Sequence, residues 1–226
     1  MRTPPKLLQW FDGWPELVCI DLDGTLVDSV PDLASAVDHF LVAAGAAAAG
    51  EDRVRAWVGF GAAKLVEQAM QWASVPAVQA EQCYRDFLLF YRDNLTANTQ
   101  LYPNVLPLLK AFKRQGIPMA LITNKPSVFV KPILDHFEIG EYFSWQLGGD
   151  TLEEKKPSAM PLLHCCEDVE AQPSQCLMIG DSITDHRAAR AAGFRSMLLT
   201  YGYSQGVDLL SLEADLVADD LTELFI

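Results

Sequence analysis

The segment from Leu17 to Asp28 constrains this chain more than any other stretch of its 226 residues. It reads Leu-Val-Cys-Ile-Asp-Leu-Asp-Gly-Thr-Leu-Val-Asp, so that an apolar run ends in two aspartates followed by a Gly-Thr turn. Such a run is typical of a buried parallel strand, and open α/β sheets bind ligands at the carboxyl ends of their strands. Because side chains i and i+2 of a strand point the same way, we expect Asp21 and Asp23 to face one ligand. Two carboxylates this close repel each other, which predicts a metal ion, a shared proton or a cationic substrate beside them.

Three further segments carry polar residues where an apolar run ends or a helix is predicted to begin. They are Thr123-Asn124 after the run 117–122, Lys156-Pro157, and Gly180-Asp181-Ser182-Ile183-Thr184-Asp185. In this order, and together with the first segment, they resemble the four motifs of the haloacid dehalogenase superfamily of aspartate-nucleophile phosphotransferases. The resemblance covers nearly the whole chain and omits only about the first fifteen residues.

The order of predicted elements indicates an α/β fold with an insertion. From Pro103 onward strands and helices alternate, which implies right-handed βαβ crossovers and a doubly wound parallel sheet. An all-helical insert directly after the first strand resembles the helical cap of the superfamily. We therefore expect a Rossmann-like α/β catalytic core of residues 1–28 and 99–226, with an inserted all-helical cap domain of residues 29–98.

Local patterns place the individual elements. Strands are predicted at 117–122, 143–147, 176–179, 196–199 and 216–217, and core helices at 105–115, 127–136, 159–166 and 185–192. Helical stretches of the insert are predicted at 52–58, 62–73 and 77–94, after a first helix that runs through Leu33 and Leu41. Ser29 is predicted to cap this first helix, with Pro31 in its first turn.

The resemblance implies a catalytic role for four residues. Asp21 would be the nucleophile that forms an aspartyl phosphate, and Asp23 the general acid and base. Thr123 and Lys156 would contact the phosphoryl oxygens in catalysis and in substrate binding, and Asn124 would add to the binding site at a helix N-terminus. Dehalogenases and phosphonate hydrolases of the superfamily lack the second aspartate, so phosphoester chemistry is favoured.

The resemblance also implies a metal site. Asp21, the backbone carbonyl of Asp23, Asp181 and Asp185 would supply oxygen ligands only, and such a set suits Mg²⁺. Relatives often carry Arg-Asn where this chain has Ile183-Thr184. Whether Asp185 binds the ion directly or through water therefore stays open.

Two further lysines, Lys155 and Lys125, need separate interpretations. Lys155 competes with Lys156 for the phosphate contact, but the Lys-Pro order of the motif favours Lys156. Lys125 is interpreted as a charge at the rim of the site.

Several stretches resemble one branch of the superfamily, the bacterial phosphoglycolate phosphatases. They lie at 28–33, 53–59, 148–151 and 155–157. The cap loop of that branch usually reads Val-Gly-Asn-Gly, and here it reads Val58-Gly59-Phe60-Gly61. Phe60 is expected to face the substrate, and Arg55 is a candidate contact for a substrate carboxylate.

The resemblance therefore implies a phosphatase for a small phosphomonoester, with 2-phosphoglycolate as the first candidate. The alternatives are a phosphatase for another metabolite such as a sugar phosphate, a phosphomutase like β-phosphoglucomutase, and a non-catalytic binding protein on the same fold. A mutase would give an isomeric phosphate, whereas a phosphatase would release free phosphate.

Composition limits the partners. The formal net charge is −13 and the sequence pI is near 4.6, which argues against nucleic acid or an anionic membrane as a partner. No apolar stretch approaches the roughly 20 residues of a membrane span, and the first fifteen residues lack the apolar core of a secretory signal. We expect a cytoplasmic monomer or homodimer that acts on a small phosphorylated metabolite.

Overall fold

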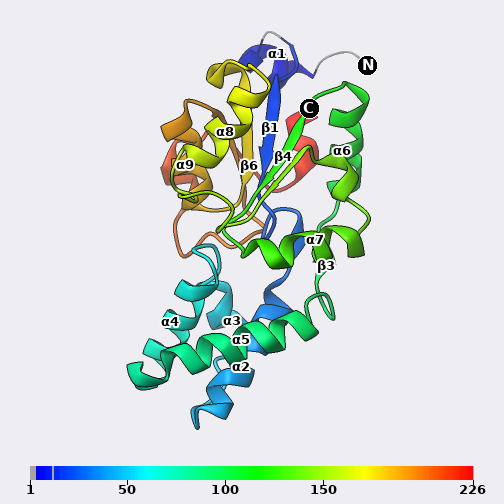
Figure 1. Ribbon diagram of the computed structural model, residues 1–226. Coiled ribbons are helices and arrows are strands. Elements are labelled where there is room, and N and C mark those ends of the chain that lie inside the picture. The colour runs from blue at the N-terminus through cyan, green and yellow to red at the C-terminus, as the bar shows by residue number, and fades with distance from the viewer. Residues whose placement is uncertain (1–3, 12, 226) are drawn as a thin grey trace.

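The computed structural model describes residues 4–11 and 13–225. A central sheet has helices on both faces, and the helices α2 to α5 lie together beyond one end of the strands (Figure 1). The α/β class predicted from the alternation of elements is confirmed.

The central sheet is parallel throughout, and within the described residues it has the strand order β5-β4-β1-β6-β7-β8. The strands are β1 (Leu17–Ile20), β4 (Met119–Ile122), β5 (Trp145–Leu147), β6 (Cys176–Gly180), β7 (Arg195–Leu199) and β8 (Leu216–Ala218). From β1 the chain builds one side of the sheet with β4 and β5, and then the other side with β6 to β8. The order of a doubly wound sheet reverses at β1, and ligands bind in the crevice at the carboxyl ends of such neighbouring strands.

Side chains of β1 alternate between two hydrophobic layers. Val18 and Ile20 belong to one layer, and Leu17 and Cys19 to the other. The first layer is covered by α1 (Pro5–Phe11), α6 (Val105–Arg114) and α7 (Ser127–His136), and the second by α8 (Met160–Asp168) and α9 (Ile183–Ala192). Because both faces of β1 are buried, its sequence is apolar at every position.

The helix α1 was not predicted from the sequence. It buries Leu7 and Phe11 against the first layer. At seven residues it is too short to show a clear helical period, and it lies outside the motif resemblance.

The helical layer consists of α2 (Val30–Ala43), α3 (Glu51–Arg55), α4 (Ala62–Trp72) and α5 (Ala80–Asp93). Phe40 of α2 meets Phe87 of α5 edge to face, with ring centroids 6.5 Å apart. The predicted helix at 52–58 ends three residues early. The chain then turns through Gly59 and Gly61, whose φ angles of 120° and 92° favour glycine.

A two-stranded antiparallel ribbon, also not predicted, joins the helical layer to the sheet. It pairs β2 (Val27–Asp28) with β3 (Gln100–Leu101), close to the predicted domain boundaries. Ser29 occupies the N-cap position of α2, but its hydroxyl makes no capping bond and instead donates to Asp23 Oδ1 at 2.5 Å. The prediction that its side chain caps the helix is therefore wrong, because Ser29 has αR-type backbone angles (φ −100°, ψ −3°) where a capping residue has extended ones.

Short 3₁₀ turns complete the fold at Ala77–Gln79, Gly140–Tyr142, Pro173–Gln175, Leu209–Leu212 and Leu221–Phe225. Over the described ranges, no helix is both long enough and apolar enough to cross a membrane.

Candidate active site

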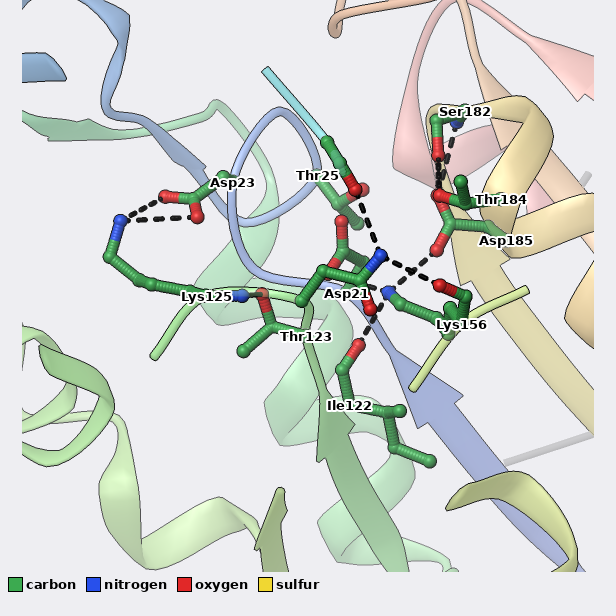
Figure 2. Close-up of polar contacts among 12 residues, drawn as sticks. Asp21, Asp23, Thr25, Ile122, Thr123, Lys125, Lys156, Ser182, Thr184 and Asp185 are labelled. Atoms are coloured by element: carbon green, nitrogen blue, oxygen red, sulfur yellow. Dashed lines mark hydrogen bonds and ion pairs between the residues drawn. The ribbon is translucent and has the colours of Figure 1, made fainter. Parts of the chain in front are cut away.

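The predicted site residues of the core meet at the carboxyl ends of β1, β4 and β6 (Figure 2). Asp21 follows β1 directly, and its backbone N–H donates to Ile179 O of β6 at 3.0 Å. The next residues fold into a tight turn in which Gly24 has φ +86°. A Cβ atom on Gly24 would overlap the Asp181 carboxylate, so the turn needs glycine both for its conformation and for its close approach.

Lys156 connects three of these strand ends. Its Nζ lies 2.7 Å from Asp21 Oδ1 and donates to Asp185 Oδ1 at 2.7 Å and to Ile122 O at 2.6 Å (Figure 2). Its side chain is only 2% exposed. Burial lowers the pKa of this ammonium, but the charges of Asp185 and Asp21 outweigh burial and raise the pKa above its ordinary value. Lys156 therefore carries a fixed positive charge between two carboxylates.

Asp185 organises the loop between β6 and α9. Its Oδ2 accepts from the backbone N–H groups of Asp181 and Ser182 and from Ser182 Oγ, and its Oδ1 accepts from Lys156. Ser182 and Asp185 form a capping box at the start of α9, which explains why this carboxylate is completely buried.

Asp181 is held from two other loops. Its Oδ1 accepts from Thr25 Oγ1 at 3.1 Å, and its Oδ2 accepts from the backbone N–H of Tyr203 at 2.5 Å. Gly202 also approaches so closely that a Cβ atom there would overlap this carboxylate. The turn after β1 and the loop after β7 thus fix one side chain.

The three buried carboxylates of Asp21, Asp181 and Asp185 form one acidic cluster, with one oxygen of each lying within 4.8 Å of the others. Burial, opposed by Lys156, raises the pKa of Asp21 to about 7. Burial and the neighbouring Asp185 raise the pKa of Asp181 well above its ordinary value. Among the described residues, the contact of Asp21 Oδ1 is the Lys156 ammonium at 2.7 Å. The three carboxylates supply oxygen ligands only, and such a set fits a hard divalent cation.

Asp23 points away from this cluster and binds Lys125. Lys125 Nζ lies 2.9 and 3.1 Å from the two carboxylate oxygens, and Ser29 Oγ donates to the same group. Lys125 Nζ also donates to Tyr91 OH of α5 at 2.6 Å. The interpretation of Lys125 as a rim charge is wrong, since its side chain is 3% exposed and packed between the core and the helical layer.

Thr123 and Asn124 lie at the end of β4, as expected. Thr123 Oγ1 accepts from the backbone N–H of Lys125 at 3.2 Å. Asn124 Nδ2 donates to Gly59 O of the cap loop and to Lys156 O, both at 2.9 Å. The Asn124 side chain therefore joins the helical layer to the core.

These groups open into one small cavity of about 40 Å³ between the core and the helical layer. Its polar lining is Asp21, Asp23, Tyr91, Thr123, Asn124 and Lys125, and its apolar lining is Leu33, Val58, Ala62, Leu65, Phe87, Pro126 and Phe129, with Gly59 and Gly61. The two candidate contacts of the helical layer, Arg55 and Phe60, do not line it.

Arg55 is engaged elsewhere. Its guanidinium donates to Glu51 at 2.9 Å, lies 3.7 Å from Asp28, and stacks over the Tyr203 ring with its centre 5.1 Å from the ring centroid. Phe60 contacts the core through its backbone carbonyl, which accepts from Lys155 Nζ at 3.0 Å. Neither residue lines the cavity in this structure, and their contacts with a substrate stay predictions.

Residues 18–199 match the model of the haloacid dehalogenase-like hydrolase family. The chain belongs to this family. That assignment agrees with the buried acidic cluster at the carboxyl ends of the strands.

Two relatives of this family member carry a specific name. This chain is 46% identical over 221 residues to a phosphoglycolate phosphatase of Pseudomonas putida. The alignment covers 96% of this chain and 81% of that protein. This chain is also 42% identical over 214 residues to a phosphoglycolate phosphatase of Nitrosococcus oceani. That alignment covers 93% of this chain and 95% of the relative.

Among solved structures, this family member is similar to a predicted phosphoglycolate phosphatase from Haemophilus somnus. The two share 38% sequence identity and superpose with a TM-score of 0.89, over 92% of this chain and 96% of the other. The sheet and the helical layer are therefore a shared architecture.

Two tyrosines that contact the site residues, Tyr91 and Tyr203, were not predicted from the sequence. Tyr91 carried no signal beyond that of an apolar helix position, and Tyr203 lies in a loop. The position of Tyr203 shortly after β7 was a usable signal, because it places the residue at the same edge of the sheet as the motifs. His186, the residue after Asp185, faces Ser196, with its Nδ1 3.3 Å from Ser196 Oγ.

Proposed function

We propose that this protein is a phosphatase that hydrolyses 2-phosphoglycolate to glycolate and phosphate. The observation that carries the proposal is the pair of aspartates on one cavity, with Asp21 paired to a buried lysine and Asp23 placed beside it. The names of relatives with 42% and 46% identity support the choice of substrate.

In the first step Asp21 acts as the nucleophile. A carboxylate oxygen attacks phosphorus, the bond from phosphorus to the ester oxygen breaks, and Asp23 gives its proton to that oxygen so that glycolate leaves. The phosphoryl group is then held as an acyl phosphate on Asp21.

In the second step Asp23 acts as the base. It takes a proton from water while the water oxygen attacks phosphorus, and the acyl phosphate bond breaks to restore the Asp21 carboxylate. Inorganic phosphate leaves, and Asp23 is again protonated for the next turnover.

The proposed phosphate contacts are Lys156, Thr123 and Asn124. Lys156 offers a fixed charge beside Asp21, and the Thr123 hydroxyl faces the same cavity. Positioned donors of this kind stabilise the charge that develops on a transferring phosphoryl group. Asn124 contributes through its backbone, since its side-chain amide is occupied by Gly59 and Lys156.

The proposed metal is Mg²⁺, bound by Asp21 and Asp181, with the backbone carbonyl of Asp23 as a further ligand. When bound, the ion neutralises charge on the phosphoryl oxygens and on the acidic cluster. Asp185 already accepts four hydrogen bonds or ion pairs, so we assign it to holding Lys156 and the loop around Asp181. A cytoplasmic location, with this protein as a monomer or homodimer, is part of the same proposal.

The experiment is phosphate release from a panel of 2-phosphoglycolate, hexose phosphates, nucleoside monophosphates and pyrophosphate. It is run with Mg²⁺, with EDTA, and with the Asp21→Asn variant. A strong preference for 2-phosphoglycolate that disappears in both controls is expected. Metal-dependent release from a different phosphate would reject the substrate, and an isomeric phosphate without free phosphate would reject hydrolysis in favour of a mutase.

A further inference from the structure

The cavity has one cationic side chain among its lining residues, and that side chain is Lys125. Lys156 is not part of the lining, and its ammonium lies 2.7 Å from the Asp21 carboxylate, where the phosphoryl group is proposed to bind. Arg55, the cation expected to bind a substrate carboxylate, is held by Glu51 and Tyr203. Within the described residues, an anionic group that enters this cavity beyond the phosphate finds its opposite charge at Lys125.

We propose that Lys125 and Tyr91 bind the carboxylate of the substrate, and that this carboxylate replaces Asp23 as the ion-pair partner of Lys125. The proposal rests on the phosphatase function proposed above and assigns its substrate selectivity to these two residues. Both act on the end of the substrate that does not react, so they are specificity residues.

The geometry follows from the position of Asp23. The acid must touch the ester oxygen that it protonates, and in 2-phosphoglycolate the carboxyl carbon lies two bonds beyond that oxygen. Lys125 Nζ lies 2.9 Å from Asp23 Oδ1, and both residues line the cavity. A substrate with its phosphorus at Asp21 and its ester oxygen at Asp23 therefore presents its carboxylate to Lys125.

All three N–H donors of Lys125 are already engaged, so a substrate carboxylate can bind Lys125 only by displacing one of its present partners. An ammonium has three N–H donors. Here they face Asp23 Oδ1, Asp23 Oδ2 and Tyr91 OH (Figure 2 shows the two contacts with Asp23). An arriving carboxylate must displace at least one oxygen of Asp23, which frees Asp23 to turn toward the ester oxygen.

Tyr91 supplies a second donor. Its hydroxyl oxygen accepts from Lys125, and within the described part of the chain its own O–H donates to no protein acceptor. The residue is 1% exposed and lines the cavity. A buried O–H without an acceptor is costly, and a carboxylate oxygen beside Lys125 would satisfy it.

The rest of the cavity lining is mostly apolar and is poorly matched to a sugar phosphate. The wall formed by Leu33, Leu65 and Phe87 offers no partner for the hydroxyl groups of a sugar. A short anionic substituent fits this cavity better than a polyol.

The test compares 2-phosphoglycolate with ethyl phosphate, in which a methyl group replaces the carboxylate. The measured quantity is the ratio of the two kcat/KM values in the wild type and in Lys125→Met. A charged hydrogen-bonded contact predicts that the ratio falls about 100-fold in this variant. Lys125→Arg should restore most of the ratio, and Tyr91→Phe should lower it about tenfold.

The matched control is Lys131→Met, which removes an exposed lysine from α7 and should leave the ratio unchanged. An unchanged ratio in folded Lys125→Met, with both substrates reduced equally, would overturn the proposal and leave Lys125 as a holder of Asp23. If Lys125→Met does not fold, Tyr91→Phe alone decides in the same way.

The wild type separates the two proposals. If it hydrolyses ethyl phosphate but not 2-phosphoglycolate, the proposed function fails. Inhibition of the ethyl phosphate reaction by 2-phosphoglycolate, lost in Lys125→Met, would then still support the carboxylate contact. No such inhibition of the wild type would overturn the contact as well.

Discussion

The core wall and the helical wall of the cavity are built in different ways. The core wall carries the charged side chains of Asp21, Asp23 and Lys125. Asp21 is fixed by the buried Lys156, which lies 2.7 Å from Asp21 and 2.7 Å from Asp185. The helical wall is mostly apolar, and its loop at 58–61 is held through its backbone. We therefore expect substitutions of the core side chains to affect activity strongly, and substitutions in the loop, which docks through backbone carbonyls, to affect it less.

The backbone contacts of the loop come from three core side chains. Gln205, Asn124 and Lys155 donate to the carbonyl oxygens of three successive residues, Val58, Gly59 and Phe60. Because a carbonyl acceptor is the same in every residue, the side chain at position 60 can change while this docking is kept. The following predictions test the contrast between the two walls.

The largest expected effect is at the core nucleophile. Asp21→Asn keeps the shape of the side chain but removes the attacking oxygen charge, so kcat should fall by about 10⁴-fold or more. Steady-state phosphate release measures it, with the exposed Asp52→Asn as the control that should retain activity. Retained activity in Asp21→Asn would show that Asp21 is not the nucleophile.

Loss of the buried cation should destabilise the fold. Lys156→Met leaves Asp21 and Asp185 buried without their counter-charge, which should lower the free energy of unfolding by about 3–5 kcal/mol. Lys155→Met, one residue away and exposed, should change it by less than about 1 kcal/mol. Urea unfolding without metal compares the two, and equal losses would contradict the contrast between the buried and the exposed lysine.

Metal binding should stabilise the protein more at high pH. The pKa of Asp21 is raised to about 7, so its carboxyl group favours the folded state at low pH, and this contribution is lost as pH rises through about 7. Excess Mg²⁺ should therefore raise Tm by several degrees at about pH 8 and by much less at about pH 5. Thermal unfolding with Mg²⁺ and with EDTA measures the shift.

Asp181→Asn is the matched variant for that measurement. It removes one proposed ligand charge, so most of the Mg²⁺-dependent shift in Tm should disappear. An equal shift at both pH values in the wild type would mean that the ion does not bind at the acidic cluster.

A smaller effect is expected at the docking side chains. Gln205→Ala removes one hydrogen bond to Val58 O, and a neutral hydrogen bond predicts a rise in KM of about two- to tenfold with kcat nearly kept. Steady-state kinetics on 2-phosphoglycolate separates the two constants. A fall in kcat at constant KM would show that Gln205 affects the chemical step rather than the docking of the loop.

The smallest effect is expected at position 60. Phe60→Asn restores the residue usual in the resembled branch but leaves the carbonyl contact to Lys155 in place. Since the side chain does not line the cavity, kcat/KM should change less than about threefold. A change of more than tenfold would show that this side chain reaches the substrate.

The sequence allowed much of the core to be predicted. Asp21, Thr123 and Asp181 each follow an apolar run, and parallel strands bring such ends together at one edge of the sheet. The helix at Ser127–His136 was predicted with its observed bounds, and the strand at 176–179 lacks only Gly180. These elements could be predicted because their hydrophobic pattern and motif order can be read from short stretches of sequence.

What the sequence could not show depends on contacts between distant segments. The exposure of Lys125 is decided by Tyr91, 34 positions away, whose hydroxyl covers its ammonium. The surroundings of Arg55 are set by the loop after β7, which places the Tyr203 ring beneath its guanidinium. The backbone angles of Ser29 and its bond to Asp23 are set by the turn that joins the sheet to α2, and the residue type alone does not show them.

The central claim is that phosphate passes through Asp21, and acid quench of a single turnover with 2-phosphoglycolate tests it most directly. The account predicts a transient phosphoprotein whose added phosphate maps by mass spectrometry to Asp21 and is absent from Asp21→Asn. Release of phosphate without any phosphoprotein on the rapid-quench timescale, or phosphate mapped to another residue, would contradict the account.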